Sequence, residues 1–257
     1  MESFWPQPTY PTLALTGFQL LLLAGGMNEA AAPTGYSKFA ATVRLQLEVP
    51  QRVGMLVIYA PALIYSLSQL VGAAGGSVRL LTACCLVLHF GKRCLEVLFL
   101  HVFSGKAGFE VVAPIGAYYA FLCWLILRST GDGQAMILWP EVMPGLGLFA
   151  VGQLGNLYHH WLLVQMRTKP TAGQESKGRY VIPRGALFDF VTMPHYFCEL
   201  IAWYGLSMAV PRLNILLVAT DMTSYLAGRS VSTTRWYQEK FGSEWPAARK
   251  HMIPYVF

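Results

Sequence analysis

Seven long apolar runs divide this chain, and they restrict its possible folds more than any other feature. They cover residues 12–26, 53–73, 80–103, 112–127, 143–165, 196–210 and 213–226. A helix of about 20 apolar residues crosses the hydrocarbon core of a bilayer. Helices are required because unpaired backbone groups in lipid are costly, and no run alternates as barrel strands do. We therefore expect an all-α, polytopic membrane bundle of about seven transmembrane helices, or six because only Pro211 and Arg212 separate the last two runs.

The composition excludes an ordinary soluble domain. Of the 257 residues, 54% are hydrophobic and 12% are charged, whereas a soluble domain is about 25% charged. The net charge of +6 does not indicate a nucleic-acid partner, because the basic residues lie between the apolar runs and form no basic face. The five cysteines lie in apolar stretches without a C-x-x-C pair, so we expect neither a disulfide framework nor a zinc site.

The basic residues are distributed unevenly between the two ends of the expected bundle. With the N-terminus outside, segments 27–52, 104–111, 166–195 and the C-terminal tail hold fourteen Lys and Arg, and the outer segments hold three. Positive charge marks the cytosolic side of membrane proteins. We therefore expect a multi-pass integral membrane protein with cytosolic basic loops, in the endoplasmic reticulum of a eukaryote or the inner membrane of a bacterium. Residues 1–10 lack the basic segment of a cleavable signal peptide.

Several ionisable side chains lie inside the apolar runs, where they are costly and usually face a cavity. His89, Arg93 and Glu96 are spaced i, i+4, i+7, so one face of the third helix is polar. Lys92 and Glu96 are four residues apart and can pair. The other polar residues within or beside the runs are His101, Asn156, His159, His160, Glu199 and Asp221. We expect a polar cavity that opens toward the cytosol.

Two other patterns are given structural interpretations. A metal site is conceivable from His159, His160 and His195, but adjacent helical residues point about 100° apart, so we expect no metal. The glycine-rich segment 145–155 lies inside a run, where small residues serve close helix packing. No strand-turn-helix G-x-G-x-x-G is present, so we expect no Rossmann domain.

The C-terminal third resembles a known family. Its motifs are "YVIPRGALFDFVTMPHYFCELIAW" (180–203) and "RWYQEKFGSEWPAARKHMIPYVF" (235–257); the second also reads as a short amphipathic helix with an apolar end. They resemble the steroid 5-alpha-reductase superfamily, which includes steroid 5-alpha-reductases, trans-2-enoyl-CoA reductases and polyprenol reductases. "PTGYSKFA" (33–40) and "GNLYHH" (155–160) are similar to the steroid branch, and "KRCLEVLFLHVFS" (92–104) to the enoyl-CoA branch.

The resemblance implies one membrane reductase domain over residues 1–257, with NADPH bound from the cytosolic side mainly by residues 150–257. Arg and Lys suit its phosphates, and amide or carboxylate groups suit its carboxamide and ribose. The cofactor-binding positions that it implies are Tyr36, Lys38, Asn156, Arg167, Tyr180, His195, Glu199 and Arg229.

The resemblance also implies the reaction, which is reduction of a C=C bond conjugated to a carbonyl in a steroid or enoyl-thioester lipid. Steroid reductases hold the keto group with a Gln-Glu pair and a Tyr, whereas this chain has Leu47–Glu48 and Phe90. We expect Glu48 to begin the second helix and donate to the carbonyl, unless it pairs with Arg44. His89 and Lys92 are the other catalytic candidates. The alternatives are an S-adenosylmethionine-dependent membrane methyltransferase and a non-catalytic sterol- or lipid-binding homologue.

Overall fold

The computed structural model describes residues 4–35, 39, 46–131, 135–168, 176–177 and 180–257. Seven α-helices occur in this described part, and each overlaps one of the seven apolar runs. They are α1 (Tyr10–Gly26), α2 (Gln51–Ser68), α3 (Val78–Leu95), α4 (Phe109–Arg128), α5 (Trp139–Thr168), α6 (Pro194–Ala209) and α7 (Leu213–Phe241). The prediction of an all-α fold with seven long helices is therefore confirmed.

Short elements join these helices. Strands β1 (Glu48–Pro50) and β2 (Lys106–Gly108) pair antiparallel, as do β3 (Ser176–Lys177) and β4 (Tyr180–Val181). The single-turn helices are η1 (Met27–Ala30), η4 (Ala186–Asp189) and η5 (Gly242–Glu244), and the π-helix η3 (Glu96–Leu100) extends α3. Within the described residues, both sheets are two-stranded and antiparallel, so the parallel sheet of a Rossmann domain is not among them.

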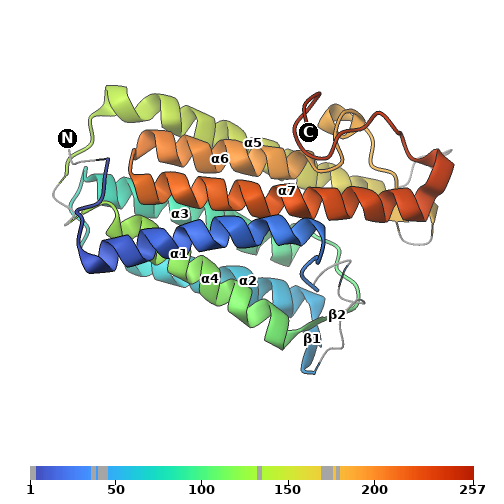
Figure 1. The fold of residues 1–257 in the computed structure, drawn as a ribbon, viewed down its shortest axis with the longest axis horizontal. Coiled ribbons are helices and arrows are strands. Elements are labelled where there is room, and N and C mark those ends of the chain that lie inside the picture. Colours follow the sequence, from blue (N-terminus) through green and yellow to red (C-terminus); the bar gives the residue numbers. More distant parts are fainter. Residues whose placement is uncertain (1–3, 36–38, 40–45, 132–134, 169–175, 178–179) are drawn as a thin grey trace.

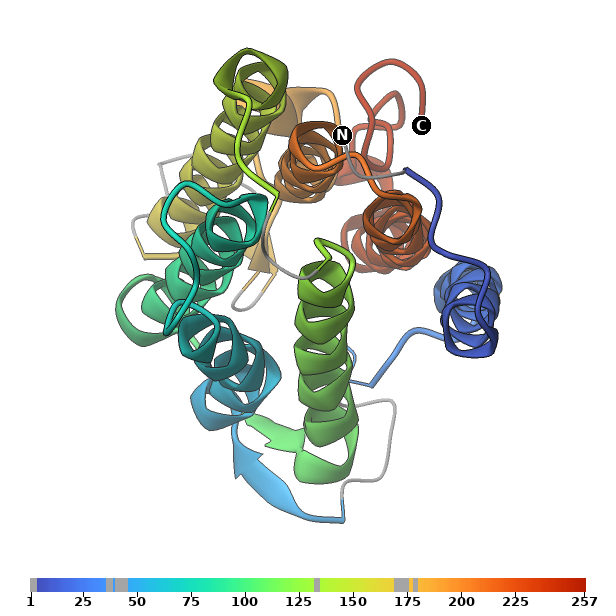
Figure 2. The ribbon, with the colours of Figure 1, turned by 90° about the vertical axis from the view of Figure 1, so that its left-hand side faces the viewer.

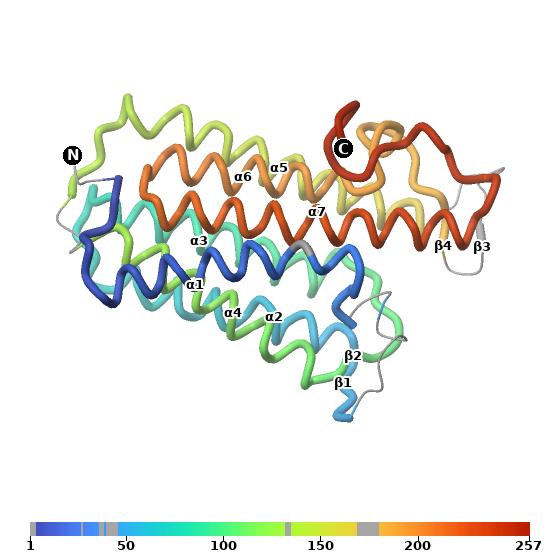
Figure 3. Tube along the Cα trace, in the orientation of Figure 1, coloured from blue at the N-terminus to red at the C-terminus, as the bar shows by residue number. Residues whose placement is uncertain are grey.

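The helices run roughly along the long axis of the molecule, with α5, α6 and α7 on one side and α2 and α4 on the other (Figure 1). Viewed from its left-hand side, the bundle has α1 at one edge against α7, while α2 and α3 lie at the opposite edge (Figure 2). The N-terminal residues lie at one end. At the other end lie the β1–β2 pair, the β3–β4 pair and the C-terminus (Figure 3). The last turns of α7 extend beyond the other helices at this end. The described parts of the segments predicted to be cytosolic thus share one end of the bundle.

Glycine allows α5 and α6 to approach closely. A Cβ atom added at Gly152 of α5 would lie 2.3 Å from the Ala202 backbone nitrogen of α6. A Cβ added at Gly145 would lie 2.3 Å from the Ala209 nitrogen. Real Cβ atoms do not approach backbone this closely, so only glycine fits. The prediction that segment 145–155 serves helix packing is confirmed.

Three sequence-based boundaries are wrong. The third apolar run is not one helix to residue 103, because η3 follows α3 and the backbone is extended at His101. Residues 235–241 form no separate short helix but continue α7, whose amphipathic end packs on β4. The second helix begins at Gln51, and Glu48 lies on β1.

Only some of the described helices are both long enough and apolar enough to be recognised as membrane spans. In the described part of the chain, two segments, Tyr10–Ala30 and Phe109–Arg128, are long and apolar enough to cross a bilayer. Polar residues lower the hydropathy of α3, which carries Lys92 and Arg93 in its last turn. Helix α6 has 16 residues and is short for a span. The helical bundle is established, and the crossing of a membrane by all seven helices stays a prediction.

Candidate functional site

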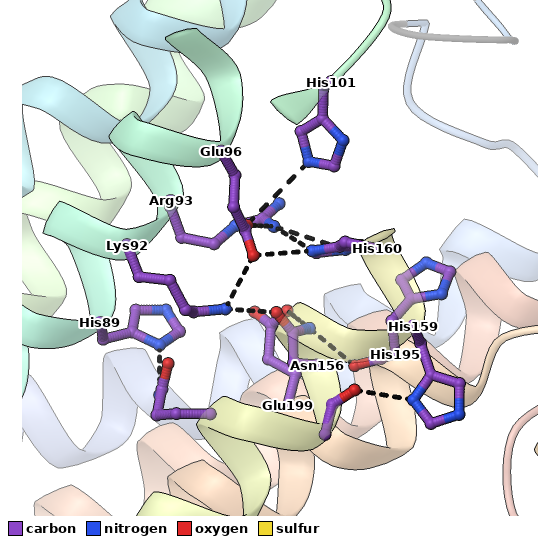
Figure 4. Close-up of polar contacts among 12 residues, drawn as sticks. His89, Lys92, Arg93, Glu96, His101, Asn156, His159, His160, His195 and Glu199 are labelled. Carbon is purple, nitrogen blue, oxygen red and sulfur yellow. Dashed lines mark hydrogen bonds and ion pairs between the residues drawn. The ribbon is translucent and has the colours of Figure 1, made fainter. Parts of the chain in front are cut away.

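A buried polar cluster joins α3, α5 and α6 (Figure 4). We call it the Glu96 cluster. Its members are Lys92, Arg93 and Glu96 from α3 and η3, Asn156 and His160 from α5, and His195 and Glu199 from α6. Helix α3 supplies its members from one face because their spacing is close to one helical turn.

Glu96 is the anionic centre of the cluster. Its side chain is 3% exposed, and its carboxylate lies 3.3 Å from Lys92 Nζ and 2.6 Å from an Arg93 nitrogen. His160 Nδ1 lies 3.1 Å from the same carboxylate. A buried carboxylate is stable only when it is paired in this way. The predicted pairing of Lys92 with Glu96 is confirmed.

Asn156 connects the two sides of the cluster. Its side-chain oxygen, Oδ1, accepts a hydrogen bond from Lys92 Nζ of α3. Its Nδ2 donates to the His195 main-chain carbonyl at 2.8 Å and to Glu199 Oε2 at 3.4 Å. The structure thus brings together four residues that sequence analysis assigned to the site: Lys92, Asn156, His195 and Glu199.

The backbone is irregular at this site. Glu96 is the first residue of the π-helix η3, and His101 follows directly after its end. His101 Nε2 lies 4.0 Å from the Glu96 carboxylate, and its ring lies 4.9 Å from the His160 ring, between centroids. Single π-helical turns occur frequently at functional sites. The wider turn brings His101 to the cluster, although regular α-helical spacing would not predict this contact.

His89 lies one to two turns before the cluster on α3. It shares a hydrogen bond of 2.8 Å with Gln153 Nε2, and its ring packs 4.9 Å from the Trp203 ring. Sequence analysis missed Gln153 and also Tyr59, whose hydroxyl accepts a 2.5 Å hydrogen bond from Arg93. Neither residue stands out in an apolar helix, because Gln and Tyr are common there without a function.

Glu96, His101 and His160 place ligand atoms within 4.8 Å of one another, a spacing compatible with a metal ion. However, Arg93 already lies 2.6 Å from the Glu96 carboxylate and 3.1 Å from His160 Nδ1. A divalent cation at this position would be repelled by the guanidinium group. The geometry therefore favours a polar cluster over a metal centre.

A second group of side chains lies beyond the cluster, where α5 and α7 end. We call it the basic-aromatic cluster: Arg167, Tyr180, Trp236, Lys240, Trp245 and Arg249. Arg167 lies 5.8 Å from the Tyr180 ring centroid, and Lys240 lies 5.2 Å from the same centroid. Sequence analysis identified only Arg167 and Tyr180 of this set.

Arg249 is the most buried cation of the basic-aromatic cluster. It stacks 4.8 Å from the Trp245 ring centroid and donates to the Pro183 carbonyl at 2.9 Å. Its Nε is buried without a hydrogen-bond partner among the described residues. Burial, and then the positive charge of Arg184, lowers the pKa of Arg249 to about 10. An anion bound here would satisfy both the unpaired N–H and the crowded positive charge.

Arg229 has a different environment from the one expected. It is 2% exposed and lies 2.6 Å from the Glu29 carboxylate, and it donates to the Thr34 carbonyl at 2.8 Å. Its charge is therefore met by Glu29, and it joins α7 to the segment after α1. Two further residues expected to bind the cofactor, Tyr36 and Lys38, lie outside the described residues, as does Arg44.

The expected position of Glu48 is wrong. Its side chain is 45% exposed on β1 and pairs with Lys106 of β2 rather than pointing into the bundle. Pro50 explains the difference, because a proline disfavours helical geometry in the residue before it. The residues just before Pro50 instead pair with β2, with Glu48 opposite Gly108.

Comparison with known proteins identifies the family. Residues 101–257 match the family model described as 3-oxo-5-alpha-steroid 4-dehydrogenase. The human 3-oxo-5-alpha-steroid 4-dehydrogenase 1 is 30% identical over 222 residues, which cover 82% of each chain. The chain belongs to the 3-oxo-5-alpha-steroid 4-dehydrogenase family.

Members of this family are oxidoreductases that act on C=C bonds. A second similar relative is the Very-long-chain enoyl-CoA reductase of Dictyostelium discoideum, 29% identical over 67% of this chain and 56% of its own length. The steroid 5-alpha-reductase DET2 of Arabidopsis thaliana is 32% identical over 60% of this chain and 59% of its own. The resemblance to the steroid 5-alpha-reductase superfamily is confirmed.

Proposed function

We propose that this protein is a membrane-embedded, NADPH-dependent reductase of a C=C bond conjugated to a carbonyl in a lipid. The observation that carries the proposal is the buried chain of contacts from Lys92 through Asn156 to His195 and Glu199. These contacts bring a cation, an amide and a carboxylate together inside an apolar helical bundle. The chain that forms this bundle belongs to a family of oxidoreductases. These groups suit the carboxamide, the ribose and the reacting carbonyl.

The residues present fit the cofactor. A dinucleotide is polyanionic and carries an adenine ring, and the basic-aromatic cluster offers cations beside flat rings. The unpaired Nε of Arg249 is a donor suited to a phosphate oxygen. In this proposal Arg167, Lys240 and Arg249 hold the phosphates and Tyr180 contacts the adenine. Asn156, His195 and Glu199 face the nicotinamide end.

Bound NADPH would supply the hydride for the carbon β to the carbonyl, and the enolate that forms would take up a proton from water at the α carbon. Lys92 is the proposed donor to the carbonyl oxygen, where negative charge develops during reduction. An ammonium group has three N–H bonds, and Glu96 and Asn156 accept two of them. The third is left for the substrate. Glu96 and Arg93 position Lys92, and the surrounding apolar helices exclude water, which strengthens the hydrogen bond.

Embedding in a membrane is supported by the surface of the bundle. Large apolar side chains are exposed along the helices, including Leu21, Ile64, Phe99 and Leu154. A soluble monomer rarely exposes so much apolar surface, whereas lipid covers it at no cost. In this proposal the lipid substrate enters from the bilayer and the cofactor enters from the end that carries the basic segments. Two of the relatives are named for a 3-oxosteroid and for an enoyl-CoA, and both Δ4-3-oxosteroids and trans-2-enoyl thioesters carry a conjugated carbonyl.

The test is reduction by the purified full-length protein in lipid nanodiscs. NADPH is supplied with a Δ4-3-oxosteroid or with a trans-2-enoyl-CoA, and the product is identified by mass spectrometry. A gain of two hydrogens with either substrate supports the proposal, and Lys92→Met should lower the rate of this reaction about 10²–10³-fold. Thermal stabilisation by S-adenosylmethionine rather than NADPH would point to a methyltransferase. Binding of the lipid without turnover would point to a non-catalytic homologue.

A further inference from the structure

A cavity of about 700 Å³ opens at the end of the bundle where α1 and α7 begin and α4 ends (Figure 2). The described residues that line it include Phe4, Trp5, Leu15, Leu125, Arg128 and Arg212. They come from the segment before α1, from α1 itself, from the last turn of α4 and from the start of α7. The Leu213 backbone nitrogen donates to the Phe4 carbonyl at 2.9 Å, which holds the segment before α1 against α7. We call this space the outer cavity.

The outer cavity is positively charged. Arg128 and Arg212 both line it, and none of the described lining residues is Asp or Glu. The segments predicted to lie outside hold three Lys or Arg in all, and the third is Arg79. Arg79 donates to the Leu127 carbonyl at 3.0 Å and to Gln69 at 2.7 Å, whereas the Arg128 side chain has no hydrogen bond or ion pair among the described residues. Two guanidinium groups at one cavity suit an anion, and phosphate above all.

Apolar surface continues from the outer cavity along α1. Trp5 is exposed at the cavity, and Leu15 and Leu125 give it an apolar wall. Tryptophan is enriched where a membrane meets water. Of the residues of α1, Gln19 alone is buried, and large side chains such as Leu21 are exposed. The cavity therefore combines cations at one end of the bundle with an apolar surface that runs from there toward its middle.

We propose that the outer cavity binds the phosphate headgroup of a membrane phospholipid. Arg128 and Arg212 would donate to the phosphate oxygens, because guanidinium groups match the geometry of phosphate. The acyl chains would lie on the exposed apolar face of α1. The lipid would thus join the start of α1 to α4 and α7 and stabilise the bundle. This site goes beyond the proposed function, because it lies at the opposite end of the bundle from the basic-aromatic cluster and its lipid is not the substrate.

The test measures thermal unfolding of the full-length protein, purified in detergent and freed of lipid, with three probes. Dioleoylphosphatidylglycerol carries both the phosphate and the acyl chains, dioleoylglycerol lacks the phosphate, and inorganic phosphate lacks the chains. At about 100 times its Kd, the phospholipid should raise the Tm by about 5 °C or more. The other two probes should leave the Tm nearly unchanged. An equal rise with inorganic phosphate would assign the cavity to a free anion, and an equal rise with dioleoylglycerol would remove any role for the cations; either result overturns the inference.

Variants locate the effect in the outer cavity. The double variant Arg128→Gln, Arg212→Gln should lose the rise in Tm that the phospholipid produces. Arg79→Gln is the matched control, because Arg79 lies at the same end of the bundle and is not among the residues that line the cavity. It should keep the full rise, with each variant compared with its own Tm in the absence of lipid.

Native mass spectrometry supplies a second readout that does not depend on the stability of the variants. The wild type and Arg79→Gln should retain one phospholipid more than the double variant. An undiminished rise in Tm, or equal retention of phospholipid, in the double variant overturns the inference. Neither measurement involves turnover, so the inference can fail while the proposed reductase stands, and the reductase can fail while the lipid site stands.

Discussion

Arg93 donates a hydrogen bond of 2.6 Å to Glu96, three residues later on the same helical segment. This contact lies where α3 changes into the π-helix η3. The Arg93 guanidinium also contacts His160 and Tyr59. A single ion pair thus fixes side chains from α2, α3 and α5 around the position proposed for the reacting carbonyl.

Loss of the Glu96 charge should destabilise the fold. Glu96→Gln leaves Lys92 and Arg93 buried without their anion, and removal of one partner from a buried ion pair costs about 3–5 kcal/mol. Glu48→Gln is the matched control, because its pair with Lys106 is 45% and 63% exposed, and such pairs contribute about 0–1 kcal/mol. Thermal unfolding in detergent measures both. Similar thermal unfolding midpoints for Glu96→Gln and Glu48→Gln would contradict the burial of the Glu96 cluster away from water.

The roles of Lys92 and Glu48 can be separated by turnover. Lys92→Met removes the proposed donor and should lower kcat about 10²–10³-fold, while Glu48→Leu should remain active because Glu48 lies on exposed β1. Single-turnover reduction, with NADPH binding as a control, measures both effects. If Glu48→Leu is inactive and Lys92→Met is active, the donor is Glu48, as the resemblance alone implies.

Much of this architecture follows from the sequence. Each apolar run forms a helix because lipid-compatible segments must satisfy their own backbone hydrogen bonds. The polar face of α3 is predictable because His89, Arg93 and Glu96 repeat with the helical period. The glycine-rich segment 145–155 likewise predicts close helix packing, and the structure shows that the partner is α6. These features are local, so a single stretch of sequence contains all the information that they need.

Long-range pairing is what the sequence does not reveal. Arg229 meets Glu29, 200 residues earlier in the chain, and an isolated arginine in a basic tail is equally compatible with a phosphate contact. Glu48 and Lys106 belong to strands of three residues, too short for periodicity to identify. The basic-aromatic cluster depends on the end of α7 packing against β4, which the apolar pattern ending at residue 226 does not indicate.

Arg167 should contribute to binding of the cofactor. Arg167→Ala removes a proposed phosphate contact, and a charge-assisted hydrogen bond contributes about 1.5–3 kcal/mol. The KM for NADPH should therefore rise at least about 10-fold, with little change in the KM for the lipid. Arg128→Ala is the control, because Arg128 ends α4 at the opposite end of the bundle. Equal KM values for NADPH in the two variants would place the cofactor elsewhere.

Arg229 should affect stability more than cofactor binding. Its pair with Glu29 is buried, with side chains 3% and 5% exposed, so Arg229→Ala should destabilise the protein by about 3–5 kcal/mol. The double variant Arg229→Ala, Glu29→Gln should lose less than the sum of the single losses, because contacting residues are coupled. Thermal unfolding measures this coupling. Additive losses would show that the two side chains act independently.

Helix packing predicts unequal effects of substitution at two glycines of α5. In Gly152→Val the new side chain would overlap the α6 backbone at Ala202, and overpacking costs about 1–3 kcal/mol or more. Gly147 has nothing within 4 Å of an added Cβ, so Gly147→Ala should stabilise the helix by up to about 1 kcal/mol. Opposite shifts in Tm are expected, and a neutral Gly152→Val would contradict the close approach.

The C-terminal tail should loosen in mild acid. His251 packs 5.1 Å from the Phe257 ring, between centroids, and shares a 3.0 Å hydrogen bond with Thr234. Burial, and then the charges of Arg235 and Lys250, lowers its pKa below the usual 6.5. As the pH falls below 6.5, the unfolded chain binds a proton that the folded chain resists, so stability falls until the folded pKa is passed. Above 6.5 this group has no effect.

The comparison with His251→Gln isolates that contribution from other titrating groups. Glutamine keeps a hydrogen-bonding side chain for Thr234 and cannot gain a proton in this range. Between about pH 7.5 and about pH 5.5 the Tm of the wild type should fall further than the Tm of the variant. Limited proteolysis of the tail should show the same difference, because docking of residues 250–257 depends on the neutral imidazole. Parallel pH profiles for the two proteins would show that His251 titrates as it does in the unfolded chain.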